Sequence, residues 1–325
     1  MKPLDKVNFD ASSLIVNYPP RWSGRNKLLV FEIASSSRFP FEGQVAYSRW
    51  AEEALPLLLQ SRPLFAVRSG VFEYAVPSES RTVDWHLNFA DPNLFIAYDS
   101  SLLAQDELQV AEHPVLGSLR DALVSTGKYP RTIDGRGRPT PITITGVQRR
   151  CAIDTRPNPS TGCLRGLYGN EFARALVGAV AAATKPLSPP TLSNILAIAA
   201  PSSGDGEYSR DEITYVLSAA YTAFTVARRE SERLVPTYSR TTIHTGFWGC
   251  GAFGGNRTLM TIIQSLAADA ADVDIVFWAI DKPGVKTAED ARRQYEIFRN
   301  SISSISDFLD ILVHERFLWG VSNGT

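Results

Sequence analysis

The sequence is poor in cysteine and histidine, with three cysteines and four histidines among its 325 residues. Cys151, Cys163 and Cys250 form no paired framework, which excludes a disulfide-stabilised secreted scaffold and fits a reducing compartment. The four histidines lie far apart along the chain and lack the spacing of metal ligands. We therefore expect no metal site and no bound cofactor.

Long hydrophobic runs and an excess of charge of one sign are also missing. No apolar run approaches the roughly 18 residues that a bilayer-spanning helix needs. The first residues, MKPLDKVNFD, lack the apolar core of a secretion signal. The formal net charge is −1, so electrostatics favours neither nucleic acid nor an anionic membrane as a partner. We expect a cytoplasmic protein that binds neither, although export without a conventional signal stays open.

The pattern that is present is that of an α/β protein. Apolar runs of the buried-strand type at 194–200 and 273–280 alternate with helical patterns at 115–125 and 211–232. This alternation predicts helices on both faces of one sheet. Further predicted elements are a helix at 43–59, strands at 64–67, 83–89 and 142–152, and helices at 101–110, 170–184 and 288–312. Residues 1–80 are interpreted as an accessory segment packed on the core, and residues 81–325 as the main domain.

The most specific feature is the stretch at 245–256, TGFWGCGAFGGN, which holds five glycines in twelve residues. It lies between a β-prone segment at 240–244 and a helical pattern at 259–267. In this layout, backbone N–H groups and a helix N-terminus bind a phosphate or a diphosphate. The sequence therefore predicts a diphosphate-binding loop.

Within this loop, Gly249, Gly251 and Gly254 also form the pattern G-x-G-x-x-G of nicotinamide enzymes. A dinucleotide fold needs several βα units after that pattern and an acidic residue about 20 positions on, at the end of the next strand. Here only about one helix of chain follows the next strand, so an oxidoreductase is disfavoured. Trp248 and Phe253 place aromatic rings beside the loop, which suits a ligand that carries both phosphates and rings.

The second informative region, residues 88–109, carries the acidic residues Asp91, Asp99, Asp106 and Glu107 among apolar and aromatic neighbours. Adjacent acids often form a solvated helical face. A carboxyl group near apolar walls can instead have a raised pKa and act as an acid. Both interpretations stay open from these residues alone.

Together the two regions resemble those of the poly(ADP-ribose) glycohydrolase (PARG) family of macrodomain-like proteins. The family loop reads TGxWGCGAFGGD, and the family's acidic segment reads DFAN…GGG…QEE where this chain has FAD…FIA…QDE. The resemblance spans roughly residues 84–283 and implies a macrodomain-like α/β/α sandwich with a mixed sheet. It also implies a hydrolase that cleaves the C1″ glycosidic bond of protein-linked ADP-ribose and releases ADP-ribose.

The resemblance assigns roles to single residues. Glu107 takes the place of the catalytic glutamate, Asp106 holds the ribose that is released, and Phe253 helps to hold the distal ribose. The residues expected to contact ADP-ribose are Phe95, Ile96, Ala97, Gln105, Trp248, Gly249, Cys250, Gly251, Ala252, Phe253, Gly254 and Gly255.

The chain departs from the family in the acidic segment. Phe95, Ile96 and Ala97 replace three glycines that allow close approach of the backbone to the ligand. Asp91 replaces an asparagine that binds ribose, and Asp99 is an additional acid. Extra carboxylates repel an anionic polymer and attract a guanidinium group.

The sequence therefore favours removal of mono-ADP-ribose from arginine. In this hypothesis Asp91 and Asp99 hold the guanidinium group or ribose hydroxyls, while Asp106 and Glu107 handle the proton and the water. The expected partners are an ADP-ribosylated protein and the product ADP-ribose. Two alternatives stay open: a glycohydrolase for poly(ADP-ribose) or O-linked ADP-ribose, and a non-catalytic ADP-ribose reader.

Overall fold

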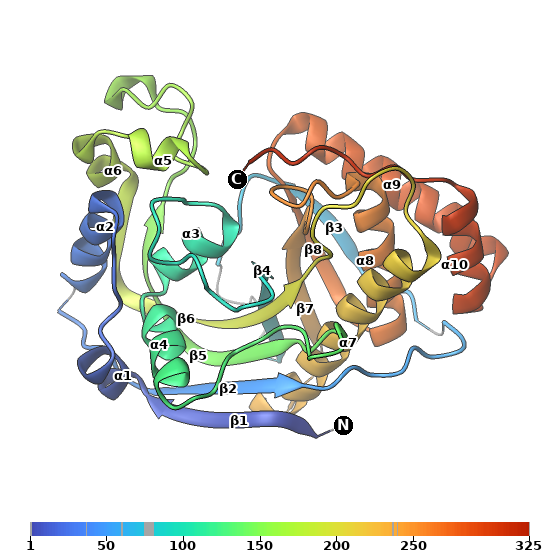
Figure 1. Cartoon of the computed structure of the whole chain (residues 1–325), viewed down its shortest axis with the longest axis horizontal. Helices are drawn as coiled ribbons and strands as arrows, with labels where there is room; N and C mark the ends of the chain where they lie inside the picture. Colours follow the sequence, from blue (N-terminus) through green and yellow to red (C-terminus); the bar gives the residue numbers. More distant parts are fainter. Residues whose placement is uncertain are drawn as a thin grey trace.

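The computed structural model describes residues 2–36, 38–59, 61–74, 81–235, 237–238 and 240–324. The described strands form an eight-stranded sheet in the order β1-β2-β5-β6-β4-β7-β8-β3 (Figure 1). The strands are β1 (Pro3–Asp10), β2 (Gln44–Trp50), β3 (Phe65–Ser69), β4 (Thr82–Ala90), β5 (Ile142–Ile153), β6 (Thr184–Ala199), β7 (Arg240–Gly246) and β8 (Asp274–Ala279). The helices are α1 (Ala11–Asn17), α2 (Arg25–Ser35), α3 (Gln105–Glu112), α4 (Val115–Ser125), the short 3-10 helix η1 (Pro159–Thr161), α5 (Glu171–Arg174), α6 (Val177–Ala183), α7 (Arg210–Leu234), α8 (Arg257–Ala271), α9 (Lys282–Ser301) and α10 (Ile305–His314).

The sheet is mixed. Strands β6, β4, β7, β8 and β3 are parallel neighbours in that order, whereas β5, β2 and β1 extend the sheet in antiparallel pairs. The carboxyl ends of the parallel strands therefore share one edge. The loops that leave β4 and β7 meet at this edge, where ligands of α/β proteins commonly bind.

Residues that alternate along the central strands face two separate cores. Trp85 on β4 and Ile198 on β6 belong to the core that contains α7, α8, α9 and α10. Ile195 and Ala197 on β6 face the other core, beneath α1 and α4. Because successive strand residues point to opposite faces, the central sheet needs helices on both sides. The predicted α/β sandwich with a mixed sheet is confirmed.

Most predicted elements are present, and the exceptions have local causes. Helix α4 has the bounds predicted for it, but the predicted helix at 43–59 is wrong. Strand β2 lies there instead, because it pairs with β1 on one side and β5 on the other. The helix predicted at 170–184 is interrupted at Ala175 and Leu176, whose extended backbones separate α5 from α6.

The first part of the chain contributes to both edges of this sheet. Strands β1 and β2 form one edge, and β3 forms the other by pairing with β8. The division between residues 80 and 81 stays a prediction. Among the described residues, no helix has the length and apolar character needed to cross a membrane.

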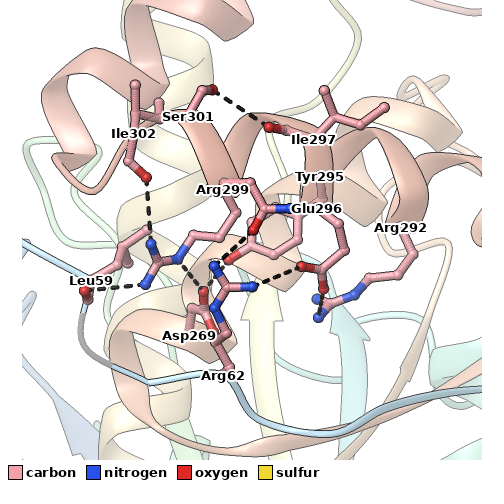
Figure 2. A network of polar contacts seen from close by, with 11 residues as sticks. Leu59, Arg62, Asp269, Arg292, Tyr295, Glu296, Ile297, Arg299, Ser301 and Ile302 are labelled. Atoms are coloured by element: carbon pink, nitrogen blue, oxygen red, sulfur yellow. Dashed lines mark hydrogen bonds and ion pairs between the residues drawn. The ribbon is translucent and has the colours of Figure 1, made fainter.

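A buried polar network fastens α8 and α9 to the segment that precedes β3 (Figure 2). Asp269 on α8 is 2% exposed and accepts hydrogen bonds from the Tyr295 hydroxyl and, at 2.8 Å, from Nε of Arg299. The Arg299 guanidinium group also donates to the carbonyl oxygen of Leu59 at 3.2 Å. Arg299 thus connects a buried carboxylate to the chain before β3.

Candidate active site

The two predicted regions meet at the carboxyl ends of β4 and β7. A cavity of about 200 Å³ lies between the loop that follows β4 and the glycine-rich loop that follows β7. Its walls include Asp91, Ile96, Ala97, Gln105, Asp106, Glu107, Trp248, Gly249, Gly251, Ala252 and Phe253. We call this the catalytic cavity. It brings together acids and glycines that lie about 140 positions apart in the chain.

Gln105 anchors the first turn of α3 to the end of β4. Its side-chain Oε1 accepts a hydrogen bond from the Phe89 N–H at 2.7 Å, and its Nε2 donates to the Leu87 carbonyl oxygen at 3.0 Å. Both polar ends of the amide are therefore satisfied by one strand. These two hydrogen bonds fix the position of Asp106 and Glu107, which follow Gln105.

Glu107 lies in the first turn of α3 and is 5% exposed. Its Oε2 accepts a hydrogen bond from the Ala104 N–H at 3.1 Å. Burial raises the pKa of this carboxyl, although Lys27 and backbone N–H groups act in the opposite direction. A raised pKa favours the protonated form of Glu107, which is the form that donates a proton as a general acid.

Asp106 is 8% exposed and receives a hydrogen bond from Nδ2 of Asn88 at 2.9 Å. Asn88 is on the face of β4 opposite to Trp85, so the strand aims its amide at α3. Burial, together with the neighbouring Glu107, raises the pKa of Asp106 to about 8. Asp106 and Glu107 form a buried acidic pair and not the solvated helical face that adjacent acids often form.

The glycine-rich loop presents backbone donors to the same cavity. Gly249 has a φ of +75°, and a Cβ there would lie 2.6 Å from the Cβ of Ala200, so a side chain does not fit. No described residue accepts a hydrogen bond from the N–H groups of Gly251, Ala252 or Phe253. With the N-terminus of α8 directly behind them, these donors suit an anion such as a diphosphate.

The loop is held from beneath and from above. Beneath it, the buried Trp248 donates from Nε1 to the Ile198 carbonyl oxygen at 3.2 Å. Above it, residues 317–324 run back across the molecule from α10 toward α5, where the Asn170 side chain donates to the Gly324 carbonyl oxygen at 2.9 Å (Figure 1). The Gly320 N–H donates to the Gly254 carbonyl oxygen at 2.7 Å. The Trp319 ring stacks on Tyr208 with their centroids 4.1 Å apart.

Five of the predicted site residues lie outside the walls of the catalytic cavity. Phe95 is fully buried in the core beneath the loop, with a φ of +55°. Asp99 is outside the walls of the catalytic cavity, and its carbonyl oxygen accepts from the hydroxyl of Ser23 at 2.6 Å. Cys250 lines a neighbouring cavity, and Gly254 and Gly255 support the loop without lining either cavity.

Asp91 is a wall residue with a partly engaged carboxylate. One of its side-chain oxygens accepts from the N–H of Asn93 at 2.8 Å and closes a local turn. Its carbonyl oxygen accepts from the hydroxyl of Thr132 at 3.0 Å. Asp91 therefore shapes the loop after β4 as well as facing the cavity.

A second cavity of about 150 Å³ adjoins the first, and the two share Phe89, Gln105, Tyr168 and Gly251. Its other walls include Phe72, Tyr74, Phe247, Arg257 and Trp278. We call it the aromatic cavity. The guanidinium carbon of Arg257 lies 4.7 Å from the centroid of the Phe247 ring. Flat aromatic walls with a cation suit a planar heteroaromatic ring next to an anion.

Two residues near the acids have no signal in the sequence. Tyr168 comes from the loop between β5 and α5, and its burial raises the pKa of its hydroxyl to about 12. Lys27 comes from α2 and is 1% exposed. Tyr168 lines both cavities through long-range packing, which no local pattern reveals. Lys27 lines neither cavity, and its Nζ donates to the Tyr98 carbonyl oxygen in the loop after β4 at 2.6 Å. Among the described residues, no group of three or more His, Cys, Asp or Glu side chains is arranged to hold a metal ion.

Comparison with known proteins finds a family that part of this chain is similar to. Residues 170–287 match the family model described as "Poly (ADP-ribose) glycohydrolase (PARG), Macro domain fold". This part of the chain is PARG-like. The matched part runs from α5 into the first turns of α9 and includes the glycine-rich loop. Its fold description agrees with the predicted macrodomain-like sandwich.

Individual relatives carry the same name. Poly(ADP-ribose) glycohydrolase 1 of Caenorhabditis elegans is 44% identical over 48 residues, which are 15% of this chain and 6% of that protein. The PARG structure from Thermomonospora curvata aligns with 87% of this chain and 97% of its own, at 15% identity and a TM-score of 0.48. PARG from Deinococcus radiodurans in complex with ADP-ribose aligns with 89% and 94%, at 13% identity and a TM-score of 0.42.

Proposed function

We propose that this protein is an ADP-ribosyl hydrolase that cleaves the C1″ glycosidic bond of ADP-ribose attached to a larger substrate. The observation that carries the proposal is the catalytic cavity, where the buried pair Asp106 and Glu107 faces the unpaired N–H groups of the glycine-rich loop. Acids that hold a proton and donors that hold an anion are the two things this reaction requires. The PARG-like match over residues 170–287 supports the same reaction.

The ligand is placed by its phosphates and its base. The diphosphate binds the N–H groups of Gly251, Ala252 and Phe253, and the adenine ring enters the aromatic cavity beside Trp278. Trp278 is available for this contact, whereas Phe277 packs in the core on the other face of β8. The distal ribose then lies against Asp106 and Glu107, since the two cavities share a wall.

Bond cleavage follows the chemistry of glycosidases. Protonated Glu107 donates its proton to the leaving oxygen as the bond from C1″ to that oxygen breaks, and positive charge develops on the ribose. The Glu107 carboxylate then takes a proton from a water molecule, whose oxygen forms the new bond to C1″. Asp106 holds the ribose hydroxyls. Hydrolysis returns Glu107 to its protonated state, so it needs no co-reactant besides water.

For the linkage, we propose that poly(ADP-ribose) or an O-linked ADP-ribose is the substrate. The names of the PARG relatives support this choice. The case for arginine depended on four acids, but Asp99 lies outside the catalytic cavity and the Asp91 carboxylate is partly engaged by the Asn93 N–H. ADP-ribosyl-arginine is the second candidate, because Asp91 still lines the cavity beside the acidic pair.

A direct assay tests the proposal. Polymer-, serine- and arginine-linked ADP-ribose are each incubated with the wild-type protein, and released ADP-ribose is quantified by mass. ADP-ribose affinity is measured in parallel by calorimetry. Release from polymer or serine supports the proposal, and release from arginine alone supports the second candidate. Tight binding with no release from any substrate would make the protein a reader.

We further propose that the reaction takes place in the cytoplasm on ADP-ribosylated proteins. The three cysteines are free thiols, and Cys151 and Cys163 are buried, as expected in a reducing compartment. Fractionation of cells that express the tagged protein tests the location.

A further inference from the structure

Arg257 is a basic residue on the wall of the aromatic cavity whose charge no carboxylate balances. It is the first residue of α8, directly after the capping residue Asn256. Among the described residues, the basic side chains that line the two cavities are Arg149 and Arg257. Arg149 forms an ion pair with Glu112 at 2.8 Å. Arg257 has no described carboxylate within ion-pair distance, so its charge is available to a ligand.

The ring of Phe247 places the guanidinium group of Arg257. The guanidinium carbon lies 4.7 Å from the ring centroid, which is within the range of a cation–π contact. Phe247 is 8% exposed and meets the ring of Phe277 edge-on, with the centroids 5.1 Å apart. Phe277 is fully buried on β8. The guanidinium group is therefore held over a fixed ring, and a cation held in this way loses little freedom when it binds a ligand.

The position of Arg257 in α8 is unfavourable for the helix alone. The first turn of a helix carries a partial positive charge, so a basic residue there opposes the helix dipole. The first turn of α8 contains no acidic residue that would offset this charge. Beside it, Gly251 lines both cavities, and no described residue accepts a hydrogen bond from its N–H group. A bound anion would supply the negative charge that the described protein lacks at this place.

We propose that Arg257 binds the phosphate on the adenosine side of ADP-ribose, beside the N–H groups of the glycine-rich loop. The inference deepens the proposed function and rests on it for the placement of the ligand. With adenine in the aromatic cavity and the distal ribose in the catalytic cavity, the adenosine-side phosphate is the nearer one to the wall that Arg257 lines. A guanidinium group can donate two parallel N–H bonds to phosphate oxygens.

The test separates the two phosphates of the ligand. AMP carries the adenosine-side phosphate, ribose 5-phosphate carries the other one, and adenosine carries neither. The affinity for ADP-ribose is measured by calorimetry, and the affinities for the three fragments by competition with ADP-ribose. Arg257→Met keeps an apolar stem without the charge, and Arg257→Lys keeps the charge without the planar pair of donors. Arg136→Met, in an exposed loop outside both cavities, is the matched control.

Arg257→Met should weaken the binding of ADP-ribose and of AMP about tenfold each, because a charge-assisted hydrogen bond is lost. The affinities for ribose 5-phosphate and adenosine should not change, and Arg257→Lys should lie between wild type and Arg257→Met. With poly(ADP-ribose) as substrate, KM should rise by the same factor at unchanged kcat, since this phosphate is bound equally before and during bond cleavage. Thermal stability without ligand should be unchanged or higher, because a positive charge leaves the helix N-terminus.

The fragments also decide against the inference. If adenosine binding weakens as much as AMP binding, Arg257 shapes the base cavity and does not bind a phosphate. If ribose 5-phosphate binding weakens and AMP binding does not, the assignment to the adenosine side is wrong. A wild-type protein that binds ADP-ribose without releasing it from any substrate ends the hydrolase proposal, and the same affinities still decide the role of Arg257. A wild-type protein that binds neither ADP-ribose nor AMP overturns the inference.

Discussion

At the scale of single residues, the two carboxyl groups of the acidic pair differ in their partners. Asp106 is held by the amide of Asn88, whereas Glu107 is held by the backbone N–H of Ala104 at the start of α3. Both acids lie in the first turn of α3 and line the catalytic cavity, but a side chain of β4 fixes Asp106 and the backbone fixes Glu107. We assign proton transfer to Glu107 and ribose binding to Asp106 from the resemblance of the acidic segment to that of the PARG family.

Replacing Glu107 by Gln should abolish proton transfer without changing the shape of the cavity. We expect hydrolysis to fall by a factor of about 10² to 10⁴, the usual contribution of a general acid, while ADP-ribose affinity stays within a few-fold of wild type. Release and calorimetric binding are measured on the same preparation. Glu289→Gln, exposed on α9, is the matched control. A variant that retains full turnover would remove Glu107 from the mechanism.

The raised pKa of Asp106 predicts how stability depends on pH. Its pKa is about 8 in the folded protein and near the ordinary aspartate value of 3.8 in the unfolded chain, so folding favours the neutral form. The stability that this gives is fully present below pH 3.8 and is lost as pH rises to about 8.

The wild-type protein loses stability as pH rises because Asp106 is kept neutral in the folded state. Asp106→Asn does not show this loss, because an amide does not ionise. Relative to wild type, the variant should gain about 1–3 kcal/mol more stability at pH 9 than at pH 5. Urea denaturation at the two pH values measures the difference. An equal effect at both values would mean that Asp106 is already ionised at pH 5.

At the scale of elements, the glycine-rich loop depends on the segment at 317–324 that crosses it. The Asn256 amide, at the start of α8, donates to the Leu318 carbonyl oxygen at 3.0 Å, and the Asn256 N–H donates to the Tyr208 hydroxyl at 3.1 Å. Trp319 holds Tyr208 by stacking on its ring. The loop therefore owes its shape to a segment more than 60 positions away.

Trp319→Ala should loosen this contact and weaken ADP-ribose binding about tenfold, because the N–H groups lose their fixed directions. At saturating substrate, kcat should change little, since the acidic pair is untouched. Leu318→Ala is the control, because that side chain is exposed and only its carbonyl oxygen contacts the loop. Equal affinities for the two variants would contradict the role given to Trp319.

How far the site can be predicted from sequence also depends on the element. The glycine-rich loop and the start of α3 are each one continuous stretch of sequence. The N–H donors of the loop and the acids of α3 are therefore visible as motifs. Phe95 is a different case: the motif alignment places it at the ligand, but the left-handed turn there directs its side chain into the core. Tyr168 enters the site only through tertiary packing, which leaves no pattern near the acids in the sequence.

At the scale of the whole molecule, Asp269 and Arg299 hold α8 and α9 to the segment before β3. Arg299→Met leaves the Asp269 carboxylate buried without the guanidinium group that it pairs with. This loss should lower the free energy of unfolding by about 3 kcal/mol. Arg62→Met removes the exposed pair with Glu296 and should cost less than about 1 kcal/mol. Chemical denaturation of both variants at pH 7 tests this contrast. Similar losses in the two would refute it.

The pairing of β3 with β8 also affects how the chain is made. The Leu64 N–H, just before β3, donates to the Asp274 side chain, 210 positions along the chain. At a synthesis rate of about 5–20 residues per second, β3 precedes its partner by roughly 10–40 seconds. During that interval β3 is complete but has no strand to pair with, and an unpaired strand invites association with other chains. The pairing of β3 with β8 is therefore a late event in the synthesis and folding of each new molecule.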